Sequence, residues 1–243
     1  MSRFFVAPED VGAEYITIEN KEDLHHMNKV LRLKAGDEID VSDGDMWEYH
    51  GKILSLEPEC CQVEILDKQK FSAEPETKIT LFQGIPKQGK MELIVQKAVE
   101  CGACEVVPFI SKRCVSRPDA KQLAKKTERW QRIAYEAAKQ CGRGIIPQVG
   151  STIDISKIPA LISPENTGIL FYECAETPLR EAVGEFTRNI DIVIGSEGGF
   201  EQSEAEKLIA AGLKCASLGK RILRCETAPI AAISVLMNMT GNM

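Results

Sequence analysis

The chain has 243 residues, of which 44% are hydrophobic and 27% are charged, so it is long enough to form one or two packed domains. The longest uncharged apolar stretch, Ala228–Met237, is shorter than the ~18 residues of a membrane span. The apolar run Phe4–Ala7 is too short for a signal peptide. We therefore expect a cytoplasmic protein that does not associate with a membrane.

The nine cysteines also favour a reducing compartment, because their number is odd and they are scattered along the chain. Cys101 and Cys104 have the spacing of a zinc-binding pair, but a structural zinc site needs four ligands and no second pair exists. The end of a helix followed by the start of a strand is a simpler explanation of this pair. We therefore predict no metal site.

The first 70 residues favour a small β-barrel. Short strands are predicted at Phe4–Val6 and Tyr15–Ile18, and alternating apolar and polar residues predict three more strands before Ile65. Asp43-Gly44-Asp45 is typical of a hairpin turn, and Lys21–Leu33 is predicted to form one short helix. Short strands joined by turns are typical of a barrel, which we assign to residues 1–70.

A polar stretch from Asp67 to Thr77 lacks periodicity, and we place the domain boundary there. Beyond it, predicted strands alternate with helices, so we expect an α/β domain with a mainly parallel sheet over residues 75–243. The predicted strands are Ile79–Phe82, Val106–Ile110, Ile169–Tyr172, Ile190–Ile194 and Ala216–Leu218, and the main predicted helices are Lys90–Glu100 and Ala120–Gln140.

Gly84–Met91 has the spacing of a phosphate-binding loop and lies between a predicted strand and a predicted helix. Such a loop needs a Ser or Thr hydroxyl for magnesium after its lysine, and backbone N–H groups around the phosphate. Met91 offers no oxygen ligand and Pro86 lacks an N–H group. We therefore do not expect hydrolysis of a nucleoside triphosphate, and we assign Lys87 and Lys90 to a basic surface.

The segment from Gly84 to Arg143 holds thirteen Lys and Arg against six Asp and Glu, a local net charge of +7, although the whole chain has a net charge of −6. Lys125, Arg129 and Arg132 share one face of a predicted helix. A solvated helix face gives the same pattern. Because the basic excess continues into the preceding loop, with Arg113 and Arg117, we expect contact with a nucleic-acid backbone.

Two loops in the C-terminal third suggest a ligand pocket. Gly195–Phe200 follows a predicted strand, and Ser203 with Glu206 has the spacing of a capping box for the next helix. The second loop, Leu218–Ala228, precedes an apolar helix. Ligands of open α/β sheets bind at the carboxyl ends of strands, where both loops begin, so one pocket can use both. Neither loop has the Gly-x-Gly-x-x-Gly pattern of an ordinary dinucleotide fold.

Together these two loops resemble the late signature loops of the SPOUT methyltransferases, in the RsmE branch. The family usually has Pro where Ser196 stands, and Ala or Thr where Cys225 stands. Further matches extend over nearly the whole chain: His26 with Val30-Leu31-Arg32 and Gly36-Asp37, Gln96-Lys97 with Glu100 and Gly102, Ser111 with Arg113, and Gln140 with Arg143.

The resemblance implies a PUA-like barrel followed by an α/β domain with a deep trefoil knot. It implies a homodimer that binds S-adenosylmethionine (SAM) in the knot and methylates N3 of a specific uridine in 16S ribosomal RNA of the small subunit. The residues expected to bind SAM are Leu170, Gly195, Ser196, Glu197, Gly198, Gly199, Leu218, Gly219, Ile222, Leu223, Arg224, Glu226, Thr227 and Ala228.

Loss of the N3 proton gives the uracil ring anionic character, which a guanidinium stabilises. Arg224 and Arg113 are the candidates, and Glu197 is a candidate proton acceptor that can equally bind the backbone of its own loop. The residues expected to contact RNA are His26, Lys29, Arg32, Lys87, Lys90, Arg113, Arg117, Lys125, Arg129, Arg132 and Arg143.

Three alternatives stay open on the sequence. The chain can be an RNA-binding ribosome-assembly module without catalysis, although such a module does not need two intact glycine loops. It can methylate another base or a ribose 2′-hydroxyl, because the resemblance alone selects uridine N3. Nucleotide hydrolysis at Gly84–Lys90 would require magnesium-dependent binding of ATP or GTP.

Overall fold

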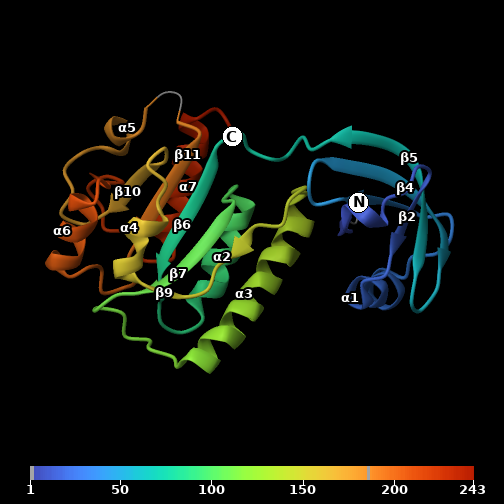
Figure 1. Ribbon diagram of the computed structural model, residues 1–243, viewed down its shortest axis with the longest axis horizontal. Coiled ribbons are helices and arrows are strands. Elements are labelled where there is room, and N and C mark those ends of the chain that lie inside the picture. Colours follow the sequence, from blue (N-terminus) through green and yellow to red (C-terminus); the bar gives the residue numbers. More distant parts are fainter. Residues whose placement is uncertain (1–2, 185–186) are drawn as a thin grey trace. The chain divides into compact units, whose positions relative to one another are not determined.

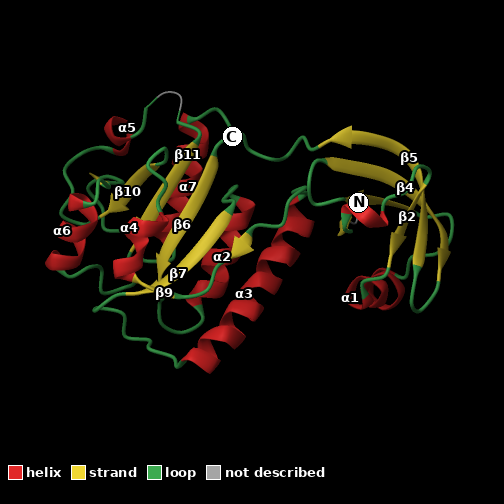
Figure 2. Ribbon diagram, in the orientation of Figure 1, coloured by secondary structure: helices red, strands yellow, loops and turns green. Residues whose placement is uncertain are grey.

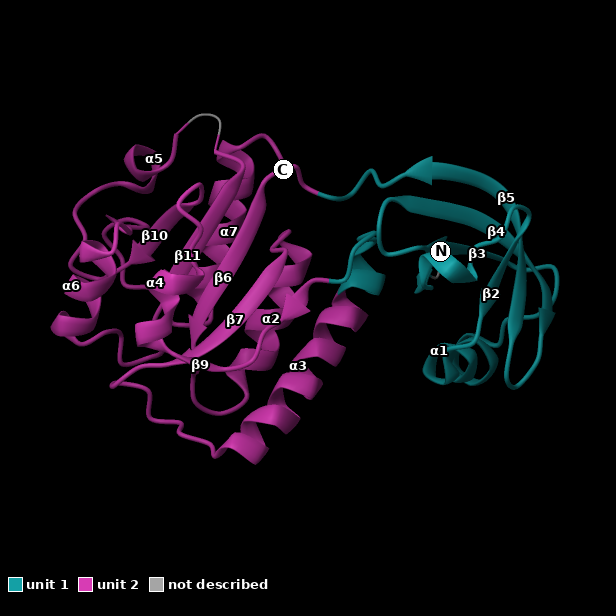
Figure 3. Ribbon diagram, in the orientation of Figure 1, with its two compact units in different colours: residues 1–74, 138–146 teal, residues 75–137, 147–243 magenta. Residues whose placement is uncertain are grey.

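The computed structural model describes residues 3–184 and 187–243, which divide into two compact units (Figures 1 and 3). The first unit contains the chain up to Glu74 together with Ala138–Ile146, and the second contains Pro75–Ala137 and Pro147–Met243. The sequence pattern predicts a boundary within residues 67–77 and does not predict the return of a later segment to the first unit.

Residues 138–146 are held in the first unit by polar contacts. Lys139 Nζ lies 2.7 Å from Asp23 Oδ1 and 4.7 Å from the centre of the Phe4 ring. The Ser42 hydroxyl donates a 2.6 Å hydrogen bond to the carbonyl of Gly144. These contacts join groups 102 and 116 residues apart, which explains why local pattern does not predict them.

The first unit is built on one five-stranded sheet (Figure 2), with the strand order β1-β3-β4-β5-β2. Its strands are β1 (Arg3–Phe5), β2 (Tyr15–Ile18), β3 (Glu38–Ser42), β4 (Trp47–Leu56) and β5 (Cys61–Lys70). β1 pairs with β3 in parallel, and the other pairs are antiparallel. Alternate residues of the strands, among them Phe4, Ile16, Ile39 and Val41, are buried in one core.

The predicted helix at Lys21–Leu33 is divided in the structure. α1 (Lys21–His25) is α-helical, and a π-helical segment follows over His26–Leu31. The segment ends at Arg32, which has a left-handed backbone with φ of 55°. Asn20 caps α1, because its side-chain oxygen accepts from the N–H groups of Glu22 and Asp23.

The Asp43 carboxylate organises the turn between β3 and β4. Its Oδ1 accepts hydrogen bonds of 3.0, 2.9 and 2.9 Å from the backbone N–H groups of Asp45, Met46 and Trp47. A buried aspartate satisfies three backbone donors in this way, which accounts for the predicted hairpin.

The second unit holds a seven-stranded sheet with the order β12-β10-β11-β6-β7-β8, and β9 also pairs with β7. All of its ladders are parallel. Its strands are β6 (Lys78–Gly84), β7 (Glu105–Ile110), β8 (Gln148–Val149), β9 (Ile153–Asp154), β10 (Thr167–Phe171), β11 (Asn189–Ile194) and β12 (Lys214–Ala216). Its helices are α2 (Lys90–Glu100), α3 (Ala120–Cys141), α4 (Ile158–Leu161), α5 (Leu179–Ala182), α6 (Gln202–Ala210) and α7 (Thr227–Met239); the last four residues of α3 belong to the first unit.

Helices cover both faces of this sheet (Figure 2). On one face, Phe82, Leu170 and Val193 pack in a core that includes Ala205 and Leu208 of α6. Side chains alternate along a strand, so Leu81, Ile169 and Ile192, which are fully buried, point to the opposite face. α2 and α7 also contact each other. The layered α/β arrangement is the one predicted from the alternation of strands and helices.

Two local predictions are wrong. Ser203 and Glu206 do not cap α6; the cap is Glu201, whose backbone N–H donates to Glu204 Oε2 at 3.0 Å. The second oxygen of Glu204 accepts from the backbone N–H of Lys112 at 2.8 Å, so this carboxylate also fastens the loop after β7. The last strand is Lys214–Ala216, two residues earlier than expected.

The nine cysteines are all free thiols in the structure. Cys101 ends α2, and the Cys104 thiol donates to the carbonyl of Ile79 at 3.2 Å. Residues 3–184 and 187–243 contain no group of three or more His, Cys, Asp or Glu arranged to hold a metal ion. No helix in these same ranges is long and apolar enough to cross a membrane.

Candidate active site

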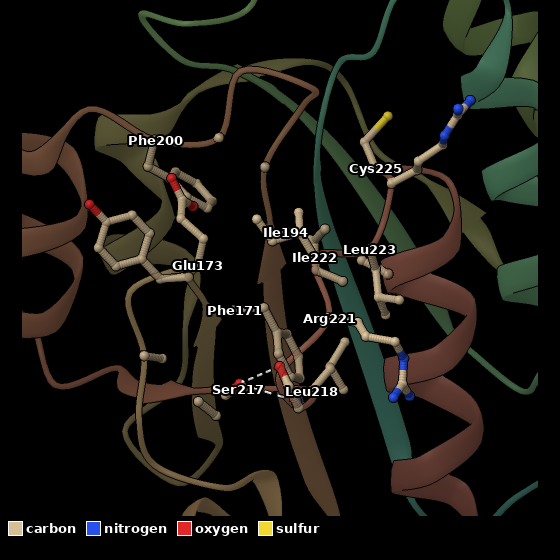
Figure 4. Close-up of a pocket in the computed structure, with 18 of the residues that line it drawn as sticks. Phe171, Glu173, Ile194, Phe200, Ser217, Leu218, Arg221, Ile222, Leu223 and Cys225 are labelled. Carbon is tan, nitrogen blue, oxygen red and sulfur yellow. Dashed lines mark hydrogen bonds between the residues drawn. The ribbon is translucent and has the colours of Figure 1, made fainter.

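A cavity of about 1010 Å³ lies in the second unit, where β10, β11 and β12 reach their carboxyl ends (Figure 4). Three stretches of chain, 171–178, 194–200 and 216–228, supply nearly all of its lining, and Lys90 from the start of α2 completes it. Parallel strands end at one edge of a sheet, which brings these stretches together although they come from different parts of the chain.

The loop after β11 needs its glycines for close packing. Gly199 has φ of 64°, and its N–H donates to the carbonyl of Ser196 at 2.9 Å. A Cβ at Gly195 would lie 3.1 Å from Gly199 Cα, and one at Gly198 would lie 2.8 Å from the carbonyl oxygen of Arg113. Beneath the loop, the buried Gln83 donates from Nε2 to the carbonyl of Gly195 at 3.2 Å. Larger residues would open the loop.

The loop after β12 turns at Gly219, which has φ of 110° and donates its N–H to Ser217 Oγ at 3.1 Å. Its end initiates α7, because the carbonyl of Arg224 accepts from the N–H groups of Thr227 and Ala228, both at 2.9 Å. Ile222 between these points is 90% exposed. An apolar side chain so exposed beside a cavity is available to cover a ligand.

The third wall follows β10 and contains residues that the sequence analysis did not assign. Phe171, Tyr172 and Glu173 line the cavity. The Tyr172 ring meets the Phe200 ring edge to face, with 6.3 Å between centroids. The Glu173 carboxylate lies 3.2 Å from the position that a Cβ of Gly199 would occupy. Their place at the carboxyl end of a predicted strand was the signal that could have identified them.

The structure places most residues expected at the SAM site around this cavity. Those that line it are Gly195, Ser196, Glu197, Gly198, Gly199, Leu218, Gly219, Ile222, Leu223, Arg224 and Ala228. Glu226 and Thr227 lie at the start of α7 outside the lining. Leu170, also expected at the SAM site, does not line the cavity. It is fully buried in the core with Val193, because side chains alternate along β10 and that of Leu170 packs under α6.

A charged cluster joins both loops at one side of the cavity. Lys90 Nζ lies 3.2 Å from Glu197 Oε1 and 3.1 Å from Glu226 Oε2. The backbone N–H of Lys87 donates to both oxygens of Glu197 at 3.2 Å. The turn that resembles a phosphate-binding loop therefore binds a carboxylate of its own chain. Lys90 is expected on an RNA-binding surface, but in the structure it lies in the cavity wall.

The two candidate catalytic arginines differ in their contacts. Arg224 is exposed and lines the cavity. Arg113 Nε lies 2.9 Å from Glu201 Oε1, and its Nη1 donates to the carbonyl of Gly198 at 3.3 Å. Arg113 thus braces the outside of the glycine loop, and it does not line the cavity.

The residues expected to contact RNA fall into several environments. Lys29, Arg32, Lys87, Lys125 and Arg132 are exposed, and His26 is half-buried. Arg129 is exposed and paired with Glu92 at 2.7 Å, and Arg117 donates to the carbonyl of Lys112 at 2.9 Å. Arg143, also expected to contact RNA, differs from the other residues of this set. It is 4% exposed and paired with Glu74 at 2.7 Å, so it is not available to RNA.

Comparison with known proteins agrees with this geometry. Residues 73–237 match a family described as an RNA methyltransferase domain, and residues 18–66 match an RNA methyltransferase PUA domain. The ribosomal RNA small subunit methyltransferase E of Bacillus subtilis is 31% identical over 229 residues, which are 90% of this chain and 88% of that protein. The Buchnera aphidicola (Schizaphis graminum) enzyme of the same name is 34% identical, over 92% of this chain and 91% of that one.

A solved structure gives the same match in three dimensions. The Neisseria gonorrhoeae ribosomal RNA small subunit methyltransferase E, bound to SAM, superposes with a TM-score of 0.89 and 31% sequence identity, over 98% of both chains. The fold therefore agrees with the expected PUA-like domain followed by an α/β methyltransferase domain of the SPOUT class. Matches over both domains show that the chain belongs to the ribosomal RNA small subunit methyltransferase E family and is an RNA methyltransferase.

Proposed function

We propose that this chain transfers the methyl group of SAM to N3 of a specific uridine in 16S ribosomal RNA of the small subunit. The observation that carries the proposal is the cavity formed by both glycine loops at the carboxyl edge of the parallel sheet. A relative with the same fold over 98% of both chains was solved with SAM, and the related proteins are named for ribosomal RNA of the small subunit.

The residues present fit SAM. Gly195, Gly198 and Gly199 carry no side chains, so that a flat ligand can approach the backbone of the loop at these positions. Leu218, Ile222 and Leu223 supply apolar walls for an adenine ring. The volume of about 1010 Å³ is sufficient for a ligand of this size. When bound, SAM supplies an electrophilic methyl group on a sulfonium.

Arg224 is proposed to stabilise negative charge on the uracil ring as N3 loses its proton, because its guanidinium is exposed at the cavity. Arg113 acts as a positioning residue through its contacts with Gly198 and Glu201. Holding the two reactants in line is expected to supply much of the rate.

Glu197 is a poor candidate for the general base. Burial alone would raise the pKa of this carboxyl group, but hydrogen bonds from its own backbone N–H, from Lys90 and from Lys87 outweigh burial and lower the pKa. A carboxylate with a lowered pKa and with both oxygens already accepting hydrogen bonds accepts a further proton reluctantly.

The RNA is proposed to contact the exposed basic residues of both units. Phosphate contacts from Lys125, Arg132, Lys29 and Arg32 would position the RNA without reading its sequence, and the target uridine would have to leave its stack to reach the cavity. A substrate in the small ribosomal subunit implies a cytoplasmic location. We propose a homodimer, supported by the partly exposed apolar side chains of Leu93, Val235 and Met239 on α2 and α7.

Titration of the full chain with SAM by calorimetry tests the proposal, with ATP-magnesium as the parallel ligand. We expect saturable SAM binding and no heat from ATP-magnesium. Methylation of small subunits that lack the modification, followed by mapping of the methylated base, then tests uridine N3. Absence of SAM binding, both alone and with ribosomal RNA present, would contradict the proposed function, as would methylation of a ribose hydroxyl.

A further inference from the structure

We infer that Lys90 is a positioning residue that joins the two glycine loops of the cavity and thereby sets its affinity for SAM, and that the Gly84–Lys90 turn serves to hold it in place. The inference rests on the proposed function, because it assigns a role within the same cavity. It also gives a role to the one sequence motif that methyl transfer leaves unexplained.

The first step is geometric. Glu197 belongs to the loop after β11, and Glu226 to the loop after β12. Lys90 Nζ lies 3.2 Å from the first carboxylate and 3.1 Å from the second, so one ammonium group contacts both loops. Among residues 195–200 and 217–228, which are all described, no direct hydrogen bond or ion pair joins one loop to the other. The polar connection between them therefore passes through Lys90.

The second step concerns how Lys90 is held. It is the first residue of α2, preceded by Gly89 with φ of 71° and Gln88 with φ of 54°. These left-handed residues turn the chain so that the N–H of Lys87 also meets Glu197. In a phosphate-binding loop, a backbone N–H and a lysine bind an anionic ligand. Here the same two kinds of donor bind an anion that the protein itself supplies.

The third step is electrostatic. The side chains of Lys90, Glu197 and Glu226 are 28%, 28% and 18% exposed, so water screens their charges incompletely. Hydrogen bonds that Lys90 donates to Glu226 and, as a smaller cause, to Glu197 raise the pKa of Lys90, which keeps it protonated. A hydrogen bond from Cys225, and further ones from its own backbone and Lys90, lower the pKa of Glu226. Without the ammonium, two ionised carboxylates would face each other across the loops and repel.

The fourth step links the cluster to the ligand. Lys90 and Glu197 line the cavity, as does Cys225 beside Glu226. Separation of the two loops would widen the space between the walls that enclose the cofactor, and a pocket that is not preorganised binds its ligand more weakly. SAM affinity is therefore the property that depends on Lys90, ahead of turnover.

The test compares Lys90→Met, Lys90→Arg and the double variant Lys90→Met/Glu226→Gln with the unmodified full chain. SAM affinity is measured by calorimetry, and kcat and KM for SAM are measured with ribosomal RNA as substrate. We expect Lys90→Met to weaken SAM binding by ~10-fold and to raise KM with little change in kcat, because it removes charge-assisted contacts that position the pocket. Lys90→Arg keeps the charge and is expected within ~3-fold of the unmodified chain.

Two further readouts separate positioning from a general loss of structure. The double variant removes one of the two repelling charges, so its SAM affinity is expected to lie between those of Lys90→Met and the unmodified chain. The affinity of Lys90→Met is expected to improve as the pH falls towards about 4, the ordinary pKa of a glutamate, because protonation of either carboxyl group relieves the repulsion. The matched control is Lys97→Met, which removes the 2.7 Å pair with Glu100 from the same helix without touching the cavity.

SAM affinity of Lys90→Met equal to that of the unmodified chain would overturn the inference, while SAM binding by the unmodified chain would still support the proposed function. Equal losses in Lys90→Arg and Lys90→Met would also overturn it, since charge would then not be the cause. No SAM binding by the unmodified chain is a different result, which contradicts the proposed function itself.

Discussion

The two units use paired charges in opposite ways. In the first unit, the side chains of Arg143 and Glu74 are 5% and 15% exposed and fasten residues 138–146 to the rest of the unit. In the second unit, Lys90, Glu197 and Glu226 are more exposed and surround a ligand cavity. The first arrangement is expected to serve stability, and the second to serve binding. The difference shows that a basic residue close to basic neighbours in sequence need not share their role.

The largest expected effect concerns the buried pair. Glu74→Gln leaves the buried guanidinium of Arg143 without its charged partner, and Glu74 also accepts from the N–H of Gly144 at 2.9 Å. We expect a loss of about 3 kcal/mol in the free energy of unfolding, measured by urea denaturation. The matched control is Glu92→Gln, which breaks the exposed pair with Arg129 and should cost less than about 1 kcal/mol. Equal losses in both variants would show that burial does not distinguish the pairs.

Arg224→Ala should have the next largest effect, on turnover. Loss of the guanidinium that stabilises the developing charge is expected to lower kcat by ~100-fold. SAM affinity by calorimetry should stay close to that of the unmodified chain. Arg180→Ala, an exposed arginine outside the cavity, is the control and should leave kcat unchanged. A loss of SAM binding in Arg224→Ala would instead assign this residue to the cofactor.

A smaller effect is expected on the surface of α3. The double variant Lys125→Gln/Arg132→Gln removes two exposed charges, so RNA affinity should fall by ~10-fold and the dependence of log affinity on log salt should become shallower. Lys207→Gln on α6 is the matched control for loss of an exposed charge. An unchanged salt dependence in the double variant would remove α3 from the RNA-binding surface.

Local pattern predicts much of this molecule. The helix at Lys90–Glu100 and the strand at Tyr15–Ile18 are confirmed residue for residue, because each has a complete apolar period between clear end signals. The two glycine loops likewise lie where strand ends in a parallel sheet must place them. These features depend on neighbours in sequence.

Two of the three errors have long-range causes. Arg143 continues a basic pattern, yet its partner Glu74 is 69 residues away and fixes it in the first unit. Leu170 packs in the core, and the next residue, Phe171, lines the cavity instead. The apolar run around Leu170 does not show which of its alternate residues face the core. The sequence pattern places Lys90 on a basic surface. Its carboxylate partners come from loops more than 100 residues later, so local pattern does not reveal them. Sequence pattern identifies such charges but not their partners.

The smallest expected effect is a pH dependence that sharpens the contrast between buried and exposed charges. Asp191 in β11 is 3% exposed, and Asn166 Nδ2 donates to its Oδ2 at 2.8 Å. Burial raises the pKa of Asp191, although hydrogen bonds from Asn166 and Thr80 oppose the rise. The folded state therefore binds this proton more tightly than the unfolded chain. The contribution to stability is complete below the unfolded pKa of about 4 and is lost as the pH rises through the folded value.

Asp191→Asn replaces the carboxylate with a neutral group of the same shape, whose oxygen still accepts from Asn166 and whose NH₂ group can donate to the Thr80 hydroxyl. At pH 7 the variant is expected to be at least as stable as the unmodified chain, with an advantage that shrinks as the pH falls towards about 4. Urea denaturation at several pH values measures this. Glu105, whose pKa is raised by burial and then by the charge of Asp191, should titrate at a lower pH in the variant. A variant less stable at every pH would mean that the ionised carboxylate of Asp191 is itself stabilising, and that burial in this sheet does not penalise its charge.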